Sequence, residues 1–132
     1  GTIPIVQAIA MGTAIDYAEG LGFANIHDYE AALLRYATKK LESIPGLKIY
    51  GPPCEAKGPI CSFTIDGVSS EDLANLLDIK GVFVRHGHHC TMPLHDKLVI
   101  SASVRASFAM YNTHDEVDHL IEAVKFALER LT

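Results

Sequence analysis

Residues 102–108 alternate strictly between apolar and polar side chains, and this pattern constrains the fold more than any other part of the chain. Successive side chains of a β-strand point to opposite faces, so one face of this strand is apolar and the other polar. The apolar positions are Ala102, Val104, Ala106 and Phe108. The polar positions are Ser103, Arg105 and Ser107. The pattern predicts a strand whose apolar face is covered by other elements and whose polar face carries Arg105.

The segment after this strand predicts one such cover. Thr113 and Glu116 have the spacing of a capping box, in which two side chains satisfy the first free N–H groups of a helix. Apolar residues then recur at helical spacing. They are Val117, Leu120, Ile121, Val124, Leu128 and Leu131.

The remaining elements follow from caps, breakers and periodicity. Helices are predicted from Thr2 to Gly20, from Asn25 to Pro45 and from Ser69 to Gly81, and strands at 47–50, 59–65 and 82–85. The order is two helices, two strands, a helix, two strands and a helix. This order predicts one compact α+β domain over residues 1–132, in which helices cover a small sheet.

The first predicted helix, within residues 1–20, is unusually apolar, and Asp16 is its first charged residue. A helix with so little polar surface is normally covered on most sides. The rest of the sequence contains no evident cover, so we expect this helix to pack on a large domain that the sequence does not include. The absence of a starting methionine agrees with a chain that begins partway into a longer protein.

Charge and cysteine content argue against several classes of protein. The net charge of −5 disfavours a nucleic-acid binder, because phosphate backbones attract basic surfaces. No apolar run is long enough to cross a membrane, and no signal peptide is visible. The 3 cysteines cannot all pair with one another, so a reducing compartment such as the cytoplasm is expected.

The densest reactive cluster runs from Arg85 to Cys90 and includes His86, His88 and His89. Nearby cations favour the thiolate, which is the reactive form of cysteine, so Cys90 is predicted to be a nucleophile. A surface loop with ordinary histidines and a half-buried cysteine is one alternative. A zinc or copper site is another, because His86, His88 and Cys90 would share one face of an extended segment. No second ligand pair at a familiar spacing supports the metal site.

Arg105 is the second candidate residue, because it lies on the polar face of the predicted strand. A guanidinium there is suited to hold a carboxylate by two parallel hydrogen bonds. A salt bridge to an acidic neighbour within the chain is the alternative, and the residues alone leave both open. Cys54 and Cys61 are interpreted as structural.

Two stretches of the sequence carry a resemblance to a known family. RHGHHCTMPL at 85–94 and VRASFAMYNT at 104–113 resemble the C-terminal part of the group II cysteine desulfurases. These are the SufS-type enzymes of iron–sulfur cluster assembly, which are close to the selenocysteine lyases. GLGFANIHDYE, LESIPGLKIYGPP and the final helix also resemble the family. His86 stands where the family usually has serine or threonine, which changes the environment of the thiol.

The resemblance implies a homodimeric enzyme of fold type I that uses pyridoxal phosphate, located in the cytoplasm or, in a plant or alga, the plastid stroma. Such enzymes convert L-cysteine or L-selenocysteine to L-alanine, leave a persulfide on the active cysteine and pass the sulfur to an acceptor protein. Matched by position, Cys90 is that nucleophile, Arg105 binds the substrate carboxylate and Arg85 is a second active-site arginine. Thr2 matches a threonine that contacts the cofactor phosphate of the partner subunit, although proline follows one place later than in the family.

One part of the implied chemistry has no counterpart in the sequence. The cofactor needs a lysine for its Schiff base, which the family places in a Ser-x-His-Lys type of motif. The lysines here, none in such a context, are Lys39, Lys40, Lys48, Lys57, Lys80, Lys97 and Lys125. We therefore expect a small C-terminal domain of a fold type I enzyme that is inactive alone. A stand-alone sulfur carrier and a metal-binding or structural module are the alternatives.

Overall fold

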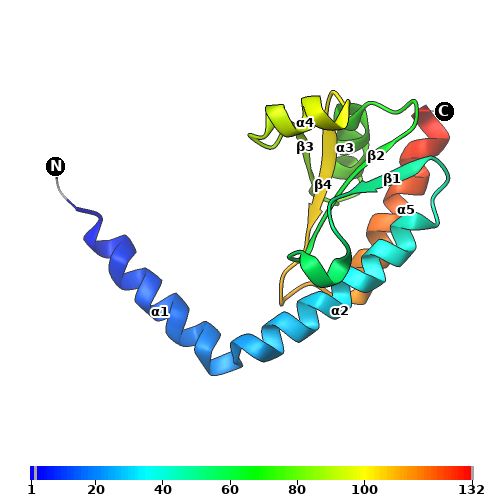
Figure 1. Ribbon diagram of the computed structural model, residues 1–132. Coiled ribbons are helices and arrows are strands. Elements are labelled where there is room, and N and C mark those ends of the chain that lie inside the picture. Colours follow the sequence, from blue (N-terminus) through cyan, green and yellow to red (C-terminus); the bar gives the residue numbers. More distant parts are fainter. Residues whose placement is uncertain (2, 132) are drawn as a thin grey trace.

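The computed structural model describes residues 1 and 3–131, so Thr2, the residue matched to a cofactor contact, lies outside the described residues. These residues form five α-helices and four strands, which are labelled in Figure 1. The helices are α1 (Ile5–Leu21), α2 (Phe23–Glu42), α3 (Ser70–Ile79), α4 (Met92–Leu98) and α5 (His114–Leu131). The strands are β1 (Leu47–Tyr50), β2 (Ile60–Ile65), β3 (Arg85–Gly87) and β4 (Ser103–Ser107), with a short 3₁₀ turn, η1 (Cys54–Ala56), between β1 and β2.

The four strands form one antiparallel sheet in the order β1-β2-β4-β3. Helices α2, α3 and α5 pack on one face of this sheet, where Phe63 of β2 lies directly opposite Val104 of β4. Both side chains are fully buried, and with Leu34, Leu77 and Val124 from the three helices they belong to one hydrophobic core. The predicted α+β class with helices over a small sheet is confirmed, and the other face of the sheet is available to carry a site.

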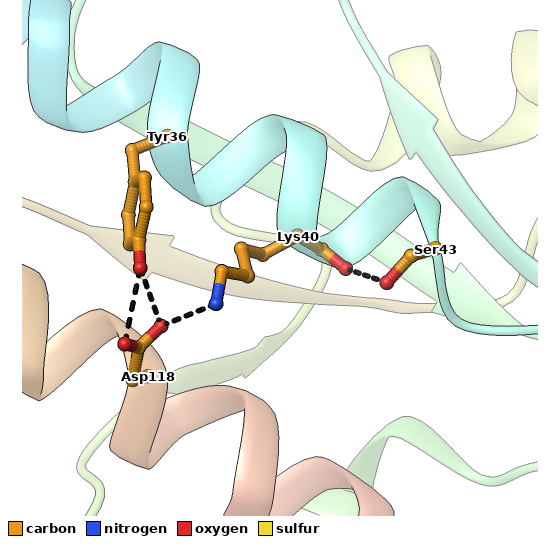
Figure 2. A network of polar contacts seen from close by, with 4 residues as sticks. All are labelled: Tyr36, Lys40, Ser43 and Asp118. Carbon is orange, nitrogen blue, oxygen red and sulfur yellow. Dashed lines mark hydrogen bonds and ion pairs between the residues drawn. The ribbon is translucent and has the colours of Figure 1, made fainter.

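A polar network joins α2 to α5 at the rim of this core (Figure 2). The Tyr36 hydroxyl donates to both carboxylate oxygens of Asp118, at 2.8 and 3.0 Å, and Lys40 Nζ lies 2.9 Å from the same carboxylate. The hydrogen bond from Lys40, with that from Tyr36, lowers the pKa of Asp118, and Asp118 in turn raises the pKa of Lys40. The network fixes how the two helices lie against each other and therefore how they support the sheet.

Two predicted helix starts are confirmed by their caps. The Ser69 hydroxyl accepts from the backbone N–H of Asp72 at 3.3 Å at the start of α3. At α5 the capping box is complete, because Glu116 N–H donates to Thr113 Oγ1 at 3.2 Å and Thr113 N–H donates to Glu116 Oε2 at 2.8 Å. These caps fix where the helices under the sheet begin.

The structure differs from the sequence predictions at one strand and one helix. The strand predicted at 82–85 is displaced to β3, because the partner that defines it is β4 and its register starts at Arg85. Helix α4 was not predicted, since its 7 residues follow directly on the reactive cluster and contain a proline. In α2 the buried stripe contains Leu34 and Ala37, whereas Tyr29 is exposed and donates its hydroxyl to the Asn112 carbonyl at 2.6 Å.

Helix α1 projects away from the α+β unit (Figure 1) and contains no buried residue. Gly22 ends it with φ of 86°, a left-handed value that suits glycine, and the chain turns there into α2. Large apolar side chains such as Val6 and Ile9 are about 70% exposed or more. No helix among the described residues combines the length and the apolar character needed to cross a membrane.

Candidate functional site

Cys90 lies at the tip of a tight turn between β3 and α4. The turn is closed by the backbone N–H of Thr91, which donates to the His88 carbonyl at 2.8 Å, and the Thr91 hydroxyl donates to the same oxygen at 2.7 Å. The two central residues, His89 and Cys90, have φ values of 50° and 61°. Positive φ at both central positions is the requirement of a type I′ turn. Cys90 is exposed, so the turn presents its thiol to solvent.

This turn is strained, because neither central residue is glycine. A left-handed backbone costs an ordinary residue about 1–2 kcal/mol. Such strain persists only where neighbouring contacts over-determine the conformation. The His89 ring supplies one such contact, since Nε2 donates to the Ser103 carbonyl of β4 at 3.1 Å. The cysteine is therefore held in a defined position by its neighbours, although its own side chain is free.

A row of polar side chains crosses the sheet face opposite the core. Tyr50 of β1 is directly opposite Ser62 of β2, Ser62 is opposite Arg105 of β4, and Arg105 is opposite Arg85 of β3. Directly opposed residues of antiparallel strands point to the same face, with Cβ atoms about 5 Å apart. Two like charges so placed repel each other unless an anion lies between them. The strand register thus brings together the two arginines that the sequence predicted for carboxylate binding.

Arg105 has no ion pair to offset this repulsion. Among residues 1 and 3–131 no carboxylate lies within salt-bridge distance of its guanidinium. Its Nε is buried and has no hydrogen-bond partner within that part of the chain. A buried donor left unpaired costs about 1–3 kcal/mol, more when it is charged. The salt-bridge alternative is not supported, and the unpaired N–H is of the kind that binds a planar anion.

The turn and Arg105 line the same cleft, which has a volume of about 340 Å³. His89 and Thr91, on either side of Cys90, contribute to its wall together with Arg105. Apolar side chains from α4 and the segment after it complete the wall: Leu94, Leu98 and Ile100. A small molecule with a carboxylate on Arg105 would therefore lie beside the turn that carries the thiol.

Burial lowers the pKa of His89 below its usual value of 6.5, with a smaller contribution from the positive charge of Arg105. A histidine with a lowered pKa in the folded state stabilises the fold fully above pH 6.5. That contribution is lost as the pH falls through the lowered pKa, because the unfolded chain binds the proton more readily. We therefore expect wild-type protein to lose more stability between about pH 7.5 and about pH 5.5 than His89→Asn, which does not titrate.

Urea unfolding of both proteins at both pH values measures this difference, since the two proteins differ only at residue 89. Asparagine is chosen because it tolerates a positive φ better than other residues without a ring. Parallel losses of stability in the two proteins would contradict the lowered pKa of His89.

The other two cysteines occupy different environments. Cys61, on β2, is fully buried, and burial raises the pKa of its thiol. The Thr38 hydroxyl lies 3.5 Å from Cys61 Sγ and 3.4 Å from Cys54 Sγ, so one threonine of α2 contacts both thiols. Their interpretation as structural residues agrees with this packing. Neither lines the cleft around Arg105.

The structure does not support the metal site that the spacing of His86, His88 and Cys90 allowed. The segment is not extended, because the turn at His89 and Cys90 follows β3 immediately. Within the described residues, no group of 3 or more potential ligands gathers closely enough to hold a metal ion. His114, the first residue of α5, is exposed, and its ring meets that of Tyr36 edge-on at 4.6 Å.

The sequence analysis missed one residue of the site, His95 on α4. It is buried, with 4% of its surface exposed, and both ring nitrogens are hydrogen-bonded. Thr91 before Pro93, followed by two leucines four positions apart, is a pattern typical of a helix start. That pattern could have placed His95 on a helix next to the cluster.

The structure is an α+β domain in which the turn that carries an exposed thiol and an arginine without an ion pair line one cleft. The profile of the family described as "Aminotransferase class-V" matches residues 1–120. The chain therefore belongs to the aminotransferase class-V family.

Similar proteins and similar solved structures support this family assignment. A "Cysteine desulfurase" of Haloferax volcanii is 43% identical over 129 residues, which are 98% of this chain and 30% of the relative. A "Probable cysteine desulfurase" of Halobacterium salinarum is 46% identical over 124 residues, again 30% of that protein. The crystal structure of the cysteine desulfurase CsdA from Escherichia coli is similar with a TM-score of 0.93 and 30% identity, over 100% of this chain and 32% of that one. The chain thus spans about a third of the length of these proteins.

The family implies pyridoxal phosphate as cofactor, and the described residues fit only part of such a site. The two arginines fit the carboxylate of an amino acid. No lysine lines the cleft around Arg105. Lys48 lies on the same sheet face, but its Nζ is placed over the Tyr50 ring at 5.2 Å. The described residues therefore do not supply a cofactor pocket.

Proposed function

We propose that this chain is the sulfur-accepting C-terminal part of a cysteine desulfurase of the SufS-like group II. The observation that carries this proposal is that the strained turn with the exposed Cys90 borders, through His89 and Thr91, the same cleft as Arg105, whose buried Nε donor has no partner within the described residues. Cys90 is the nucleophile, Arg105 binds the substrate carboxylate and Arg85 supports it from the neighbouring strand. Thr2, in the proposed dimer, contacts the cofactor phosphate of the partner subunit.

The proposed reaction converts L-cysteine and the Cys90 thiol into L-alanine and a persulfide on Cys90. The Cys90 sulfur attacks the substrate sulfur, so an S–S bond forms while the Cβ–S bond of the substrate breaks. Sulfur is oxidised and the substrate carbon is reduced and protonated, so the reaction needs no external oxidant. Arg105 holds the carboxylate so that the substrate sulfur meets the thiol, which is an orientation effect. Pyridoxal phosphate, held by the remainder of the complete enzyme, would supply an electron sink for this cleavage.

The remaining parts of the proposal concern what this chain works with. L-selenocysteine is a second candidate substrate, and a sulfur-acceptor protein of iron–sulfur assembly takes the persulfide sulfur. The complete enzyme is proposed to be a homodimer in the cytoplasm, or in the plastid stroma of a plant or alga. Helix α1 is proposed to pack on the large domain that holds the cofactor, because its apolar side chains have no cover among the described residues.

Persulfide mapping tests the proposed function directly. The complete protein, loaded with pyridoxal phosphate and given L-cysteine, is expected to release alanine and to gain the mass of one sulfur atom on the peptide that contains Cys90. L-serine, which has the same carboxylate and no sulfur, is the matched control and should leave the peptide unchanged. Added sulfur on Cys54 or Cys61 instead, or no alanine, would overturn the assignment of Cys90.

A further inference from the structure

His95 is the one buried ionisable residue of the cleft that the proposed reaction does not use. Its Nδ1 lies 3.1 Å from the Thr91 carbonyl and its Nε2 lies 3.0 Å from the Ser103 hydroxyl. A carbonyl can only accept, so Nδ1 carries the hydrogen, and in the neutral ring Nε2 then accepts from Ser103 Oγ. The two contacts together fix both the ring orientation and the tautomer.

These two contacts join the turn to the sheet. Thr91 immediately follows Cys90 and closes the turn through its N–H and hydroxyl. Ser103 belongs to β4, has 2% of its surface exposed, and lies two residues before Arg105 on the same face of the sheet. The His95 ring thus connects the backbone beside the thiol to the strand that carries the carboxylate-binding arginine.

Ser103 makes a second contact with the turn, through its backbone carbonyl. Its carbonyl accepts from His89 Nε2 at 3.1 Å, while its hydroxyl donates to His95. The rings of His88 and His89 also approach the His95 ring, with centroids 5.5 and 6.0 Å away. The contacts through which the strained turn is tied to β4 therefore converge on one serine. We call the pair His95 and Ser103 the clasp.

We propose that His95 is a positioning residue, which, through Ser103, fixes the Cys90 turn at a set distance from Arg105. This role rests on the proposed function, since it matters for transferring sulfur from a substrate whose carboxylate Arg105 holds. His95 itself does not touch the reacting sulfur atoms. A displacement of about 1 Å in such a geometry can lower a rate by about 100-fold, even though the substrate still binds.

The test uses four variants of the complete enzyme. His95→Leu removes both hydrogen bonds of the His95 ring. His95→Asn retains a donor near the position of Nδ1, and His95→Gln retains a polar atom near the position of Nε2. Ser103→Ala removes the hydroxyl that contacts Nε2. Single-turnover persulfide formation on Cys90 is expected to fall about 10- to 100-fold in His95→Leu. The rates of His95→Asn and His95→Gln should lie between those of wild type and His95→Leu. Ser103→Ala, which keeps the Nδ1 contact and loses the Nε2 contact, should resemble His95→Asn. The KM for L-cysteine should stay within about twofold in all four, because both arginines remain.

His119→Leu is the matched control, since His119 is an exposed histidine that bonds the Lys80 carbonyl and does not line the cleft. It should change neither rate nor KM. The clasp variants should lower kcat and leave KM unchanged, whereas the control should change neither. A histidine with a merely structural role would not produce this pattern. Unchanged persulfide formation in His95→Leu and Ser103→Ala would overturn the proposal.

A second measurement does not depend on desulfuration. In the 132-residue chain, nitrogen-15 NMR of the His95 ring should find the hydrogen on Nδ1, and Ser103→Ala should alter the Nε2 resonance. Hydrogen on Nε2 would overturn the clasp, whatever the enzyme does. If the wild-type complete enzyme forms no persulfide, the proposed function fails and this role fails with it. If the wild-type complete enzyme forms the persulfide and His95→Leu forms it at the same rate, only the proposed positioning role of His95 is wrong.

Discussion

Cys90→Ser in the complete protein is expected to abolish persulfide formation and alanine release, lowering turnover about 10³-fold or more. A serine hydroxyl cannot form the S–S bond that accepts the substrate sulfur, although it fits the same turn. The exposed position of Cys90 makes the change local, because no buried packing is lost. Turnover is measured as alanine formed per enzyme, and folding is checked by thermal unfolding, which should be unchanged.

The other cysteines provide the matched controls. Cys54→Ser, near the surface, and Cys61→Ala, in the core, should each retain most of the turnover per folded molecule. Cys61→Ala is expected to destabilise the fold, because Cys61 is fully buried on β2. Retained turnover in Cys90→Ser would remove both the nucleophile and the proposed function.

Arg105→Lys is expected to weaken L-cysteine binding by about 1.5–3 kcal/mol, or about 10- to 100-fold in KM. A lysine ammonium keeps the charge, but it cannot form two parallel hydrogen bonds to a carboxylate. It also cannot replace the buried Nε–H that now lacks a partner. The loss should appear for L-cysteine and not for cysteamine, which has the same thiol and no carboxylate, assayed for binding by competition.

Arg35→Lys on the outer side of α2 is the control for arginine replacement in general. Arg35 is exposed and does not line the cleft around Arg105. It should leave both KM and kcat unchanged. Equal KM values for wild type and Arg105→Lys would show that the carboxylate is bound elsewhere.

The sequence predicted the elements that are specified by patterns within a few neighbouring residues. The alternation at 102–108 predicted β4 with only its ends misplaced, and the Thr113–Glu116 pattern predicted the start of α5. These signals work because side-chain alternation and capping involve residues a few positions apart. The class α+β followed from the order of such elements.

The features that the sequence did not predict depend on contacts between distant residues. β3 was displaced because its limits are set by pairing with β4, and the direct opposition of Arg85 and Arg105 exists only in that register. Strand register cannot be derived from either segment alone. His95 was missed for the same reason, since its partner Ser103 lies 8 positions away on another element. Ser103 was correctly assigned to the polar face, yet it is buried because α4 covers it.

The opposed arginines have a consequence for how this protein responds to heat. Without a ligand, the repulsion between Arg85 and Arg105 is a cost that the folded state carries and the unfolded chain avoids. An anion that binds between them removes this cost and, by mass action, raises the melting temperature. Oxyanions such as sulfate should therefore protect the protein more than chloride at equal ionic strength. The arginine pair thus favours anion binding and lowers the stability of the unliganded protein. Such a trade-off between recognition and stability is common at functional sites.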